Sequence, residues 1–296
     1  MRLRRLLFAC VPVALLGCTP TAPDPPRACN GHVALCDRAL DDVVFAGAHN
    51  AMSSRDDGFV APNQHTALPG QLALGVRAFL LDTKPPRDGD GHVVSDGVLL
   101  CHGPCSLGSL TLNEQLARLR AFLDDEPATV VQLLVEDDAS IADTKQAFVD
   151  AGLFDELYVH DDGAEWPTLG ALVDDGTRIF LSAESGAVDS DEPWFHPMFS
   201  LYQDTPYTFG SLDVLQATES CAPNRGQASS PLLLVNHWLG NPLPDDTLAP
   251  QANAFAVLDE RVRRCAAERG RTPHVVAVDF VDTGDLVAVI DGLNGL

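Results

Sequence analysis

The chain has 296 residues, of which 46% are hydrophobic, 6% aromatic and 21% charged, so it can bury a large core and is not a disordered or low-complexity protein. Its 42 acidic residues outnumber 19 basic ones, and the formal net charge of -23 disfavours binding to nucleic acid or to an anionic membrane surface. A phosphate group is therefore expected to bind only locally, through a metal ion or a few positive side chains.

The N-terminus has the features of a secretory signal. Three arginines in the first five residues precede an apolar run over 6–16, which is 11 residues long and shorter than the roughly 20 residues that span a bilayer as a helix. The sequence Leu-Leu-Gly-Cys at 15–18 resembles the lipobox of bacterial lipoproteins, so we expect residues 1–17 to be removed and Cys18 to be acylated. The alternative is an ordinary signal peptide, in which Cys18 is a spare thiol.

A proline-rich linker is expected over residues 18–28, after the lipidated cysteine. Removing three of the 19 basic residues with the signal leaves 16 against 42 acidic ones, a net charge of -26. We expect an exported protein, either a lipoprotein anchored in a bacterial cell envelope or a secreted one. We further expect a monomer that contacts the membrane through its lipid anchor and binds no nucleic acid.

Six cysteines follow Cys18, an even number that predicts disulfides in an exported chain. The alternative is a zinc site on Cys101, His102 and Cys105, but zinc usually takes four ligands and no second Cys/His cluster lies nearby in the sequence. Six cysteines allow 15 pairings in principle. Proximity in the sequence favours the pairs Cys29–Cys36 and Cys101–Cys105 and, by elimination, Cys221–Cys265.

From residue 43 onward, short apolar runs alternate with segments of helical period, which is typical of βα units around a parallel sheet. Eight such runs in about 250 residues match the size of a (β/α)8 barrel. We predict one α/β domain over residues 29–296, a TIM-type barrel of parallel strands that need not be regular. The predicted strands are 43–47, 78–82, 98–102, 130–136, 178–183, 199–203, 232–237 and 275–280.

Helix boundaries are marked by capping residues. Thr111 and Glu114 form the ends of a capping box, and Pro127 stops the helix that follows it. Helices are also predicted over 141–151 and 252–268, each followed by a glycine. The stretch 184–224 is poorly periodic, and only one strand is predicted in it.

Polar residues follow four of the predicted strands, at the end of a barrel where active sites form. His49 and His102 could act as a general base and a general acid on a phosphodiester. Hard oxygen donors of the kind that calcium or magnesium binds lie beside them: Asn50, Asp82 and Glu136. Each residue also has a structural alternative, because histidines are often core residues and carboxylates often cap helices.

In these stretches the sequence resembles the catalytic X-domain of phosphatidylinositol-specific phospholipases C. The likeness is greatest to secreted plant and microbial proteins of the PLC-like phosphodiesterase superfamily. No single motif is specific, but their order and spacing are. The matching segments are 46–50, 71–83, 100–103, 133–137, 234–238 and 276–280.

The resemblance implies that His49 deprotonates the inositol 2-hydroxyl and that His102 protonates the departing diacylglycerol oxygen. Metal-independent bacterial members carry an arginine where this chain has Asp82, so the resemblance implies a calcium-dependent type, with calcium preferred to magnesium. Asn50 and Glu136 then fall on calcium-ligand positions. Leu80 replaces a further acidic ligand of the eukaryotic enzymes, which leaves the site one carboxylate short.

Other site residues follow less directly. Asp279, on the last predicted strand, is placed to orient His49 by accepting a hydrogen bond from its second ring nitrogen. Arg77 is expected to be a structural ion-pair partner rather than a phosphate ligand. The candidates for recognition of the head group are Lys84, Tyr202, His237 and Trp238.

The sequence therefore predicts a calcium-assisted phosphodiesterase that cleaves phosphatidylinositol or a related glycerophosphodiester by internal attack. One alternative is a glycerophosphodiester hydrolase, although these usually begin with His-Arg-Gly rather than the His-Asn-Ala found at 49–51. The other is a lipid-tethered binding or envelope protein that keeps the barrel but has lost turnover.

Overall fold

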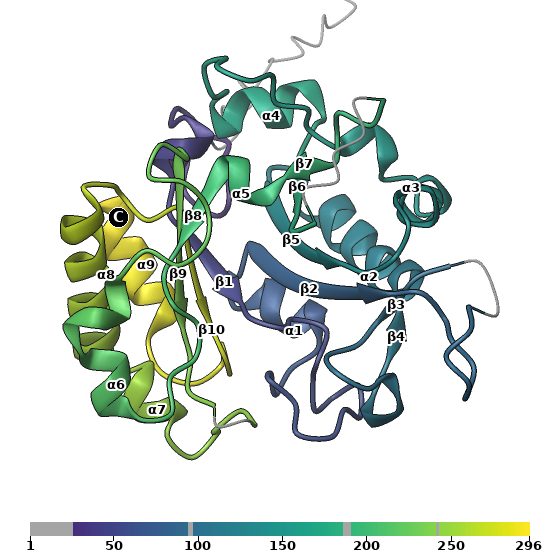
Figure 1. Ribbon diagram of the computed structural model, residues 1–296. Helices are drawn as coiled ribbons and strands as arrows, with labels where there is room; N and C mark the ends of the chain where they lie inside the picture. The colour runs from purple at the N-terminus through teal and green to yellow at the C-terminus, as the bar shows by residue number, and fades with distance from the viewer. Residues whose placement is uncertain (1–25, 94–96, 186–190, 241–242) are drawn as a thin grey trace, which may run out of the picture.

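A computed structural model describes residues 26–93, 97–185, 191–240 and 243–296 (Figure 1). The predicted signal peptide, the predicted acylation site Cys18 and most of the predicted linker lie outside these residues. Within them, no helix combines the length and the apolar character needed to cross a membrane.

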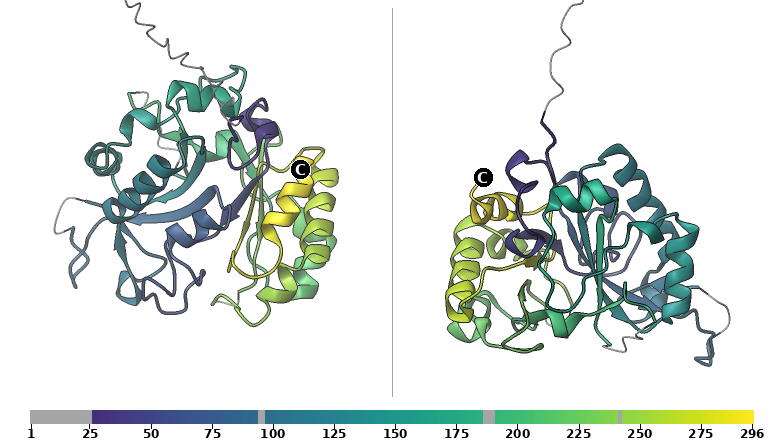
Figure 2. Two further views of the ribbon diagram at one scale, coloured as in Figure 1. Left: turned by 180° about the vertical axis from the view of Figure 1, so that it is seen from behind. Right: turned by 90° about the horizontal axis from the view of Figure 1, so that it is seen from above.

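In the described residues, eight strands pair in parallel along one sheet. Figures 1 and 2 show that this sheet is curled. Its two end strands, β7 and β8, are not paired with each other in the described residues, so hydrogen bonds do not close the barrel. The fold is thus the predicted α/β barrel in an irregular, open form. In spatial order the strands are β7 (His196–Pro197), β6 (Ile179–Ala183), β5 (Val131–Asp137), β2 (Ala78–Lys84), β1 (Phe45–Ala48), β10 (Val275–Val278), β9 (Leu232–His237) and β8 (Tyr202–Asp204).

One predicted barrel strand, 98–102, is wrong, and the strand predicted over 199–203 is only partly right, because residues 199–201 lie in a short helix (Met198–Leu201) and β8 begins at Tyr202. The run 98–102 contains β3 (Leu99–Leu100), which pairs antiparallel with the end of β2 and with β4 (Leu110–Thr111) as a side hairpin. Only Leu99 and Leu100 of this run form a strand, and the chain bends at residues 102–103. The eighth parallel strand is instead β7, which the sequence analysis missed because His-Pro is not an apolar run.

Most helices lie on the outer side of the curled sheet (Figure 2). The capping box of α2 is confirmed, because the Thr111 hydroxyl accepts from the Glu114 backbone and the Glu114 carboxylate accepts from the Thr111 backbone. The helix predicted over 252–268 corresponds to α8, which begins three residues later, at Phe255, whereas Ala252 is the last residue of the short α7. The helices are α1 (Leu68–Ala73), α2 (Leu112–Asp125), α3 (Ile141–Asp150), α4 (Leu169–Asp175), α5 (Met198–Leu201), α6 (Leu212–Gln216), α7 (Ala249–Ala252), α8 (Phe255–Arg269) and α9 (Leu286–Asn294).

Both faces of the sheet are buried, which explains why the strands read as almost continuous apolar runs. On β5, Leu133 and Val135 pack outward with the helices, whereas Leu134 packs into the interior of the barrel. Because side chains alternate along a strand, the residue two positions after an interior leucine also faces inward. This alternation carries Glu136 to the inner rim, and the same holds for Asp82 after Leu80.

The three predicted disulfides are all present. Cys29–Cys36 closes a loop near the start of the described chain, and Cys221–Cys265 ties the segment before β9 to α8. Cys101–Cys105 closes the loop that carries His102. The zinc alternative at this loop is therefore wrong, because its two sulfur ligands are bonded to each other.

Candidate active site

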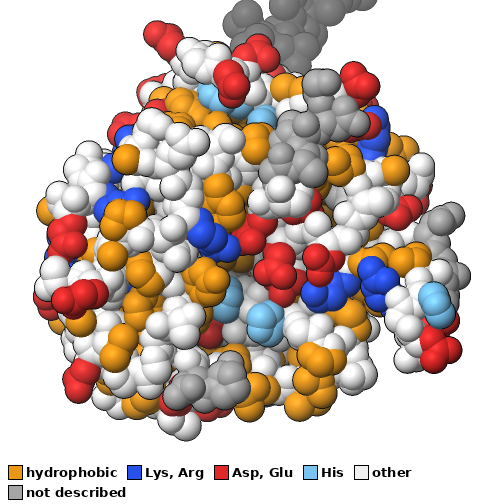
Figure 3. Space-filling view, in the orientation of Figure 1, with side chains coloured by type: hydrophobic (Ala, Val, Ile, Leu, Met, Phe, Trp, Pro, Cys, Tyr) orange, Lys and Arg blue, Asp and Glu red, His pale blue; other side chains and the backbone are white. Residues whose placement is uncertain are grey.

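A cavity of about 820 Å³ opens at the carboxyl ends of the strands. Acidic, basic and histidine side chains gather in the middle of the face that Figure 3 shows. The structure thus brings together six side chains that the sequence analysis singled out from four separate strand ends and one loop. These six are His49, Asn50, Asp82, His102, Glu136 and Asp279.

His49 follows β1 and is held on two sides. Its Nδ1 lies 2.8 Å from Asp279 Oδ1, and its ring stacks on the Trp238 indole with centroids 3.6 Å apart and planes 5° apart. The side chain is only 17% exposed. In the described part of the chain its Nε2 has no hydrogen-bond partner, so this is the nitrogen left for a substrate proton.

His102 has the same kind of carboxylate partner but a more open setting. Its Nδ1 lies 2.8 Å from Asp82 Oδ2, and 54% of its side chain is exposed. The hydrogen bond to Asp82 raises the pKa of His102 and outweighs the opposing effect of partial burial. His102 therefore keeps its proton to a higher pH than an ordinary histidine, which suits a general acid.

The two histidine rings face the same space. Their centroids are 6.4 Å apart and their planes are inclined by 68°. Both rings line the cavity, so their free edges can reach oxygens of one bound phosphate group. Two imidazoles, each held by its own carboxylate, are suited to remove a proton from an attacking oxygen and to donate a proton to a leaving oxygen.

Hard oxygen donors lie beside the histidines. Asp82 and Glu136 are neighbours in register on β2 and β5, and the Asn50 amide joins them in the cavity lining. Burial, followed by the charge of Asp82, raises the pKa of Glu136. A divalent cation would relieve this repulsion, so the donor set fits calcium or magnesium. Leu80 also lines the cavity and packs toward the barrel interior, where it offers no ligand atom.

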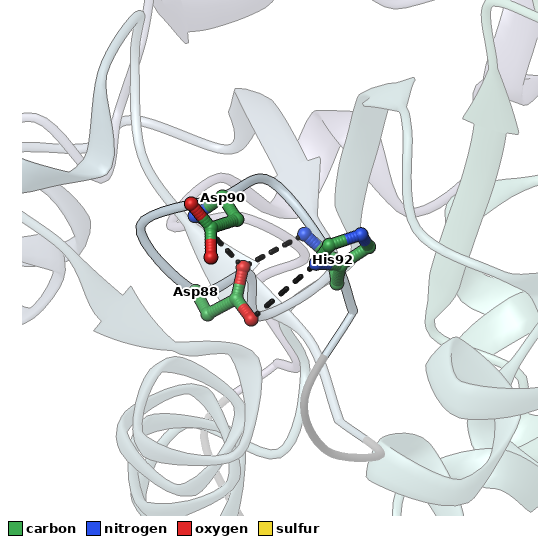
Figure 4. Close-up of side chains that lie close together, drawn as sticks. All are labelled: Asp88, Asp90 and His92. Atoms are coloured by element: carbon green, nitrogen blue, oxygen red, sulfur yellow. Dashed lines mark hydrogen bonds and ion pairs between the residues drawn. The ribbon is translucent and has the colours of Figure 1, made fainter.

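A second acidic group lies on an exposed loop away from this cavity. In the described residues, Asp88, Asp90 and His92 are the one set of at least three His, Cys, Asp or Glu side chains whose ligand atoms lie within 4.8 Å of one another (Figure 4). Asp88 Oδ1 accepts the backbone N–H groups of Asp90 and His92, so this carboxylate closes a turn. The cluster is explained by the loop itself.

The cavity is also lined by an arginine that was not predicted from the sequence. Arg225 lies in the loop before β9 and donates to Asp204 and Glu184, both at 2.7 Å. Its guanidinium also lies over the rings of Phe199 and Tyr207, at 4.5 and 4.7 Å from their centroids. The hydrophobic pattern of the sequence could not predict the position of Arg225, because the segment around it forms no regular helix or strand.

Two predicted head-group residues are wrong. Tyr202 is wholly buried in the barrel interior and its hydroxyl donates to Gln132. His237 faces outward from β9, where its Nε2 bonds to the Ala252 carbonyl, and burial followed by the charge of Arg261 lowers its pKa to about 3. Neither side chain lines the cavity, because both lie in packed layers rather than at the rim.

Trp238, Lys84 and Arg77 differ in how they lie relative to the cavity. Trp238 lines the cavity, but its ring contacts His49. Lys84 pairs with Asp138 at 2.9 Å and lines an adjoining cavity of about 350 Å³. Arg77 donates to the carbonyls of α1 and of the residue before it, so its role is structural, but it makes no ion pair in the described residues.

The fold and site together define a PI-PLC-like α/β-barrel protein. The chain belongs to the PI-PLC X domain family: the model described as PI-PLC X 1 matches residues 35–294. A relative from Arthroderma benhamiae, named PI-PLC X domain-containing protein 1, is 32% identical over 311 residues, which cover 98% of this chain and 95% of the relative.

Solved structures support the same fold. The phosphatidylinositol-specific phospholipase C of Staphylococcus aureus aligns with a TM-score of 0.57 at 13% identity, covering 88% of this chain and 95% of that one. A calcium-dependent phosphoinositol-specific phospholipase C from a Pseudomonas species aligns at 0.47 and 16% identity, covering 83% and 91%. The likeness to the Staphylococcus aureus enzyme shows the fold alone.

Proposed function

We propose that this protein is a phosphodiesterase that cleaves phosphatidylinositol or a related glycerophosphodiester, with His49 as general base and His102 as general acid. The observation that carries the proposal is the pair of histidine–aspartate contacts on two sides of one cavity, with ring centroids 6.4 Å apart. The family membership supports the same reaction class.

In this mechanism the His49 Nε2 accepts the proton of the attacking substrate hydroxyl while the oxygen of that hydroxyl forms a bond to phosphorus. Asp279 keeps the opposite nitrogen protonated and so keeps Nε2 free to accept. His102 gives its proton to the leaving oxygen as the bond from that oxygen to phosphorus breaks. Internal attack by an inositol hydroxyl gives a cyclic phosphate and a diacylglycerol.

A divalent cation, calcium in preference to magnesium, would be held by Asn50, Asp82 and Glu136. When bound, it would neutralise charge that gathers on the phosphoryl oxygens. Asp82 has two tasks in this scheme, because one of its oxygens already accepts from His102. Its carboxylate would thus join the cation site to the general acid.

The test is release of water-soluble phosphate from phosphatidylinositol vesicles by the purified full chain, with calcium and with excess EGTA. We expect turnover with calcium and its loss with EGTA. Full turnover in EGTA would remove the cation from the mechanism but leave the histidines in place.

A second candidate function is a binding protein that has lost turnover. Leu80 favours it, because this side chain lines the cavity and supplies no ligand for a cation. Thermal stabilisation by inositol phosphates, with no turnover on a panel of phosphodiesters that includes glycerophosphodiesters, would support this candidate over the enzyme.

We also propose that the chain is exported and tethered to a bacterial envelope membrane through Cys18, as a monomer. The support for export and for the anchor is the N-terminal sequence alone. Metabolic labelling with a radioactive fatty acid should mark the parent and not a Cys18→Ala variant. Equal labelling of the two would contradict the anchor.

A further inference from the structure

A buried amide side chain contacts both the proposed cation site and the aspartate that pairs with the proposed general base. Asn63 lies in the connection between β1 and α1 and is 3% exposed. Its Oδ1 accepts from Asn50 Nδ2 at 3.3 Å, and its Nδ2 donates to Asp279 Oδ1 at 3.1 Å. Asn50 belongs to the proposed cation site, whereas Asp279 belongs to the general base, so one side chain contacts both.

The contact with Asn50 fixes which way that amide points. Because the Asn50 Nδ2 is turned toward Asn63, the Asn50 Oδ1 is turned away from it, and this oxygen has no hydrogen-bond partner in the described residues. An amide must present its oxygen to bind a hard cation. Asn63 therefore holds Asn50 in the orientation that a cation ligand requires.

The contact with Asp279 supports the general base. Asp279 Oδ1 accepts from both His49 Nδ1 and Asn63 Nδ2, while its Oδ2 is buried and has no partner in the described residues. Without Asn63, the carboxylate would lose one of the two donors on its bonded oxygen and could turn. A turned carboxylate would no longer define the plane of the His49 ring.

Asn63 is itself held rigidly. The Phe280 backbone N–H donates to the Asn63 carbonyl at 2.9 Å, which ties it to the end of β10. The adjacent Gln64 is wholly buried, and its Nε2 donates to the carbonyls of His49 at 2.7 Å and Val278 at 3.1 Å. The segment thus crosses the ends of β1 and β10 and bonds to both.

We infer that Asn63 is a positioning residue that sets the orientation of the cation ligand Asn50 and of the Asp279–His49 pair at the same time. The inference rests on the proposed function and extends it to a residue that touches neither substrate nor cation. Outer contacts of this kind typically change metal affinity or activity by about 10- to 100-fold when removed.

The first experiment compares the parent with Asn63→Ala in the full chain. Calcium affinity is measured by isothermal titration calorimetry, and kcat and KM are measured on phosphatidylinositol vesicles. We expect calcium affinity and kcat each to fall by about 10- to 100-fold, with a smaller change in KM. The matched control is Gln203→Ala, because Gln203 is an equally buried amide that bonds to backbone carbonyls outside the cavity.

A second variant, Asn63→Asp, separates the two contacts. The carboxylate still accepts from Asn50 but cannot donate to Asp279, and it places a second negative charge beside that residue. We expect calcium affinity equal to or tighter than that of the parent, together with a loss of kcat. Folding of each variant is checked by its unfolding midpoint against Gln203→Ala.

Three results would overturn the inference or part of it. If Asn63→Ala matches Gln203→Ala in affinity and kcat, Asn63 positions nothing. If Asn63→Asp loses as much calcium affinity as Asn63→Ala, the assignment to Asn50 is wrong. If the parent protein binds no calcium and cleaves no phosphodiester, both the proposed function and this inference are wrong. This result would be known before any variant is made.

Discussion

The two halves of the cavity rim are built differently. On the half formed by β1, β2, β5 and β10, the site residues lie at or just after the carboxyl ends of these strands, except His102, which lies on the disulfide-closed loop after β3. On the half formed by β8 and β9, the charged group is Arg225, which comes from a loop. The first half offers histidine nitrogens and carboxylate oxygens, whereas the N–H groups of Arg225 are already bound to Asp204 and Glu184.

This difference suggests separate roles. The first half can exchange protons and accept a cation, because its reactive atoms are open to the cavity. The second half is an ion-pair cluster in which one guanidinium bonds to two carboxylates and lies over two aromatic rings. We therefore expect substitutions in the first half to change turnover and substitutions in the second half to change mainly stability.

The largest expected effect is on turnover in the first half. His49→Ala and His102→Ala should each lower kcat by about 10²- to 10⁴-fold, because each removes one proton-transfer group. The matched control is His65→Ala, since His65 also pairs with an aspartate, Asp282 at 3.0 Å, but does not line the cavity. Parent-like release of cyclic phosphate by either cavity variant would show that the two-histidine mechanism is wrong.

In the second half, Arg225→Met should lower the free energy of unfolding by about 3–5 kcal/mol, because it leaves the fully buried Asp204 without its charged partner. Urea unfolding measures the change. Arg263→Met is the control, since its pair with Asp259 is on the surface and such pairs contribute little. Equal stability of the two variants would mean that the cluster is not structural.

The disulfides allow the same comparison. Replacing Cys221 and Cys265 with alanine should cost about 4 kcal/mol, because this bond closes a separation of 44 residues, and kcat should not change. Replacing Cys101 and Cys105 should cost about 2 kcal/mol, because the separation is four residues, but kcat should fall since the loop carries His102. Unchanged kcat in the second variant would argue against a role for this loop closure in catalysis.

The last prediction concerns stability in acid. Burial lowers the pKa of both His237 and His274 to about 3, so the folded protein excludes protons that the unfolded chain binds below pH about 6.5. Stability should be full above that pH and fall as the pH drops toward 3, by up to about 2.7 kcal/mol per pH unit for the pair. Urea unfolding at pH 7, 6 and 5 tests this, and a flat profile would contradict the burial of the two rings as neutral groups.

Much of the first half could be predicted from the sequence, for a physical reason. Parallel strands that are buried on both faces have almost continuous apolar sequences, which makes them easy to predict. A polar residue two positions after a residue of the barrel interior then lies at the cavity rim, as Glu136 does after Leu134. The same rule could have found Asn236 after Leu234, but the sequence analysis chose the outward-facing His237 instead.

The second half could not be predicted in this way. Arg225 has no periodicity around it, and its partners come from β8 and from the end of β6, far away in the sequence. Asn63 was missed for a similar reason, since a lone amide in a loop has no pattern that distinguishes it. The short β7 was also hidden, because its pairing depends on the neighbouring strand rather than on its own side chains.

A crystal structure of the protein with calcium and an inositol phosphate would test the central claim most directly. We expect a calcium ion about 2.3–2.6 Å from oxygens of Asn50, Asp82 and Glu136, with the phosphorus between the rings of His49 and His102. Calcium bound only at the Asp88 loop, or a phosphate outside the space between the two rings, would contradict the account.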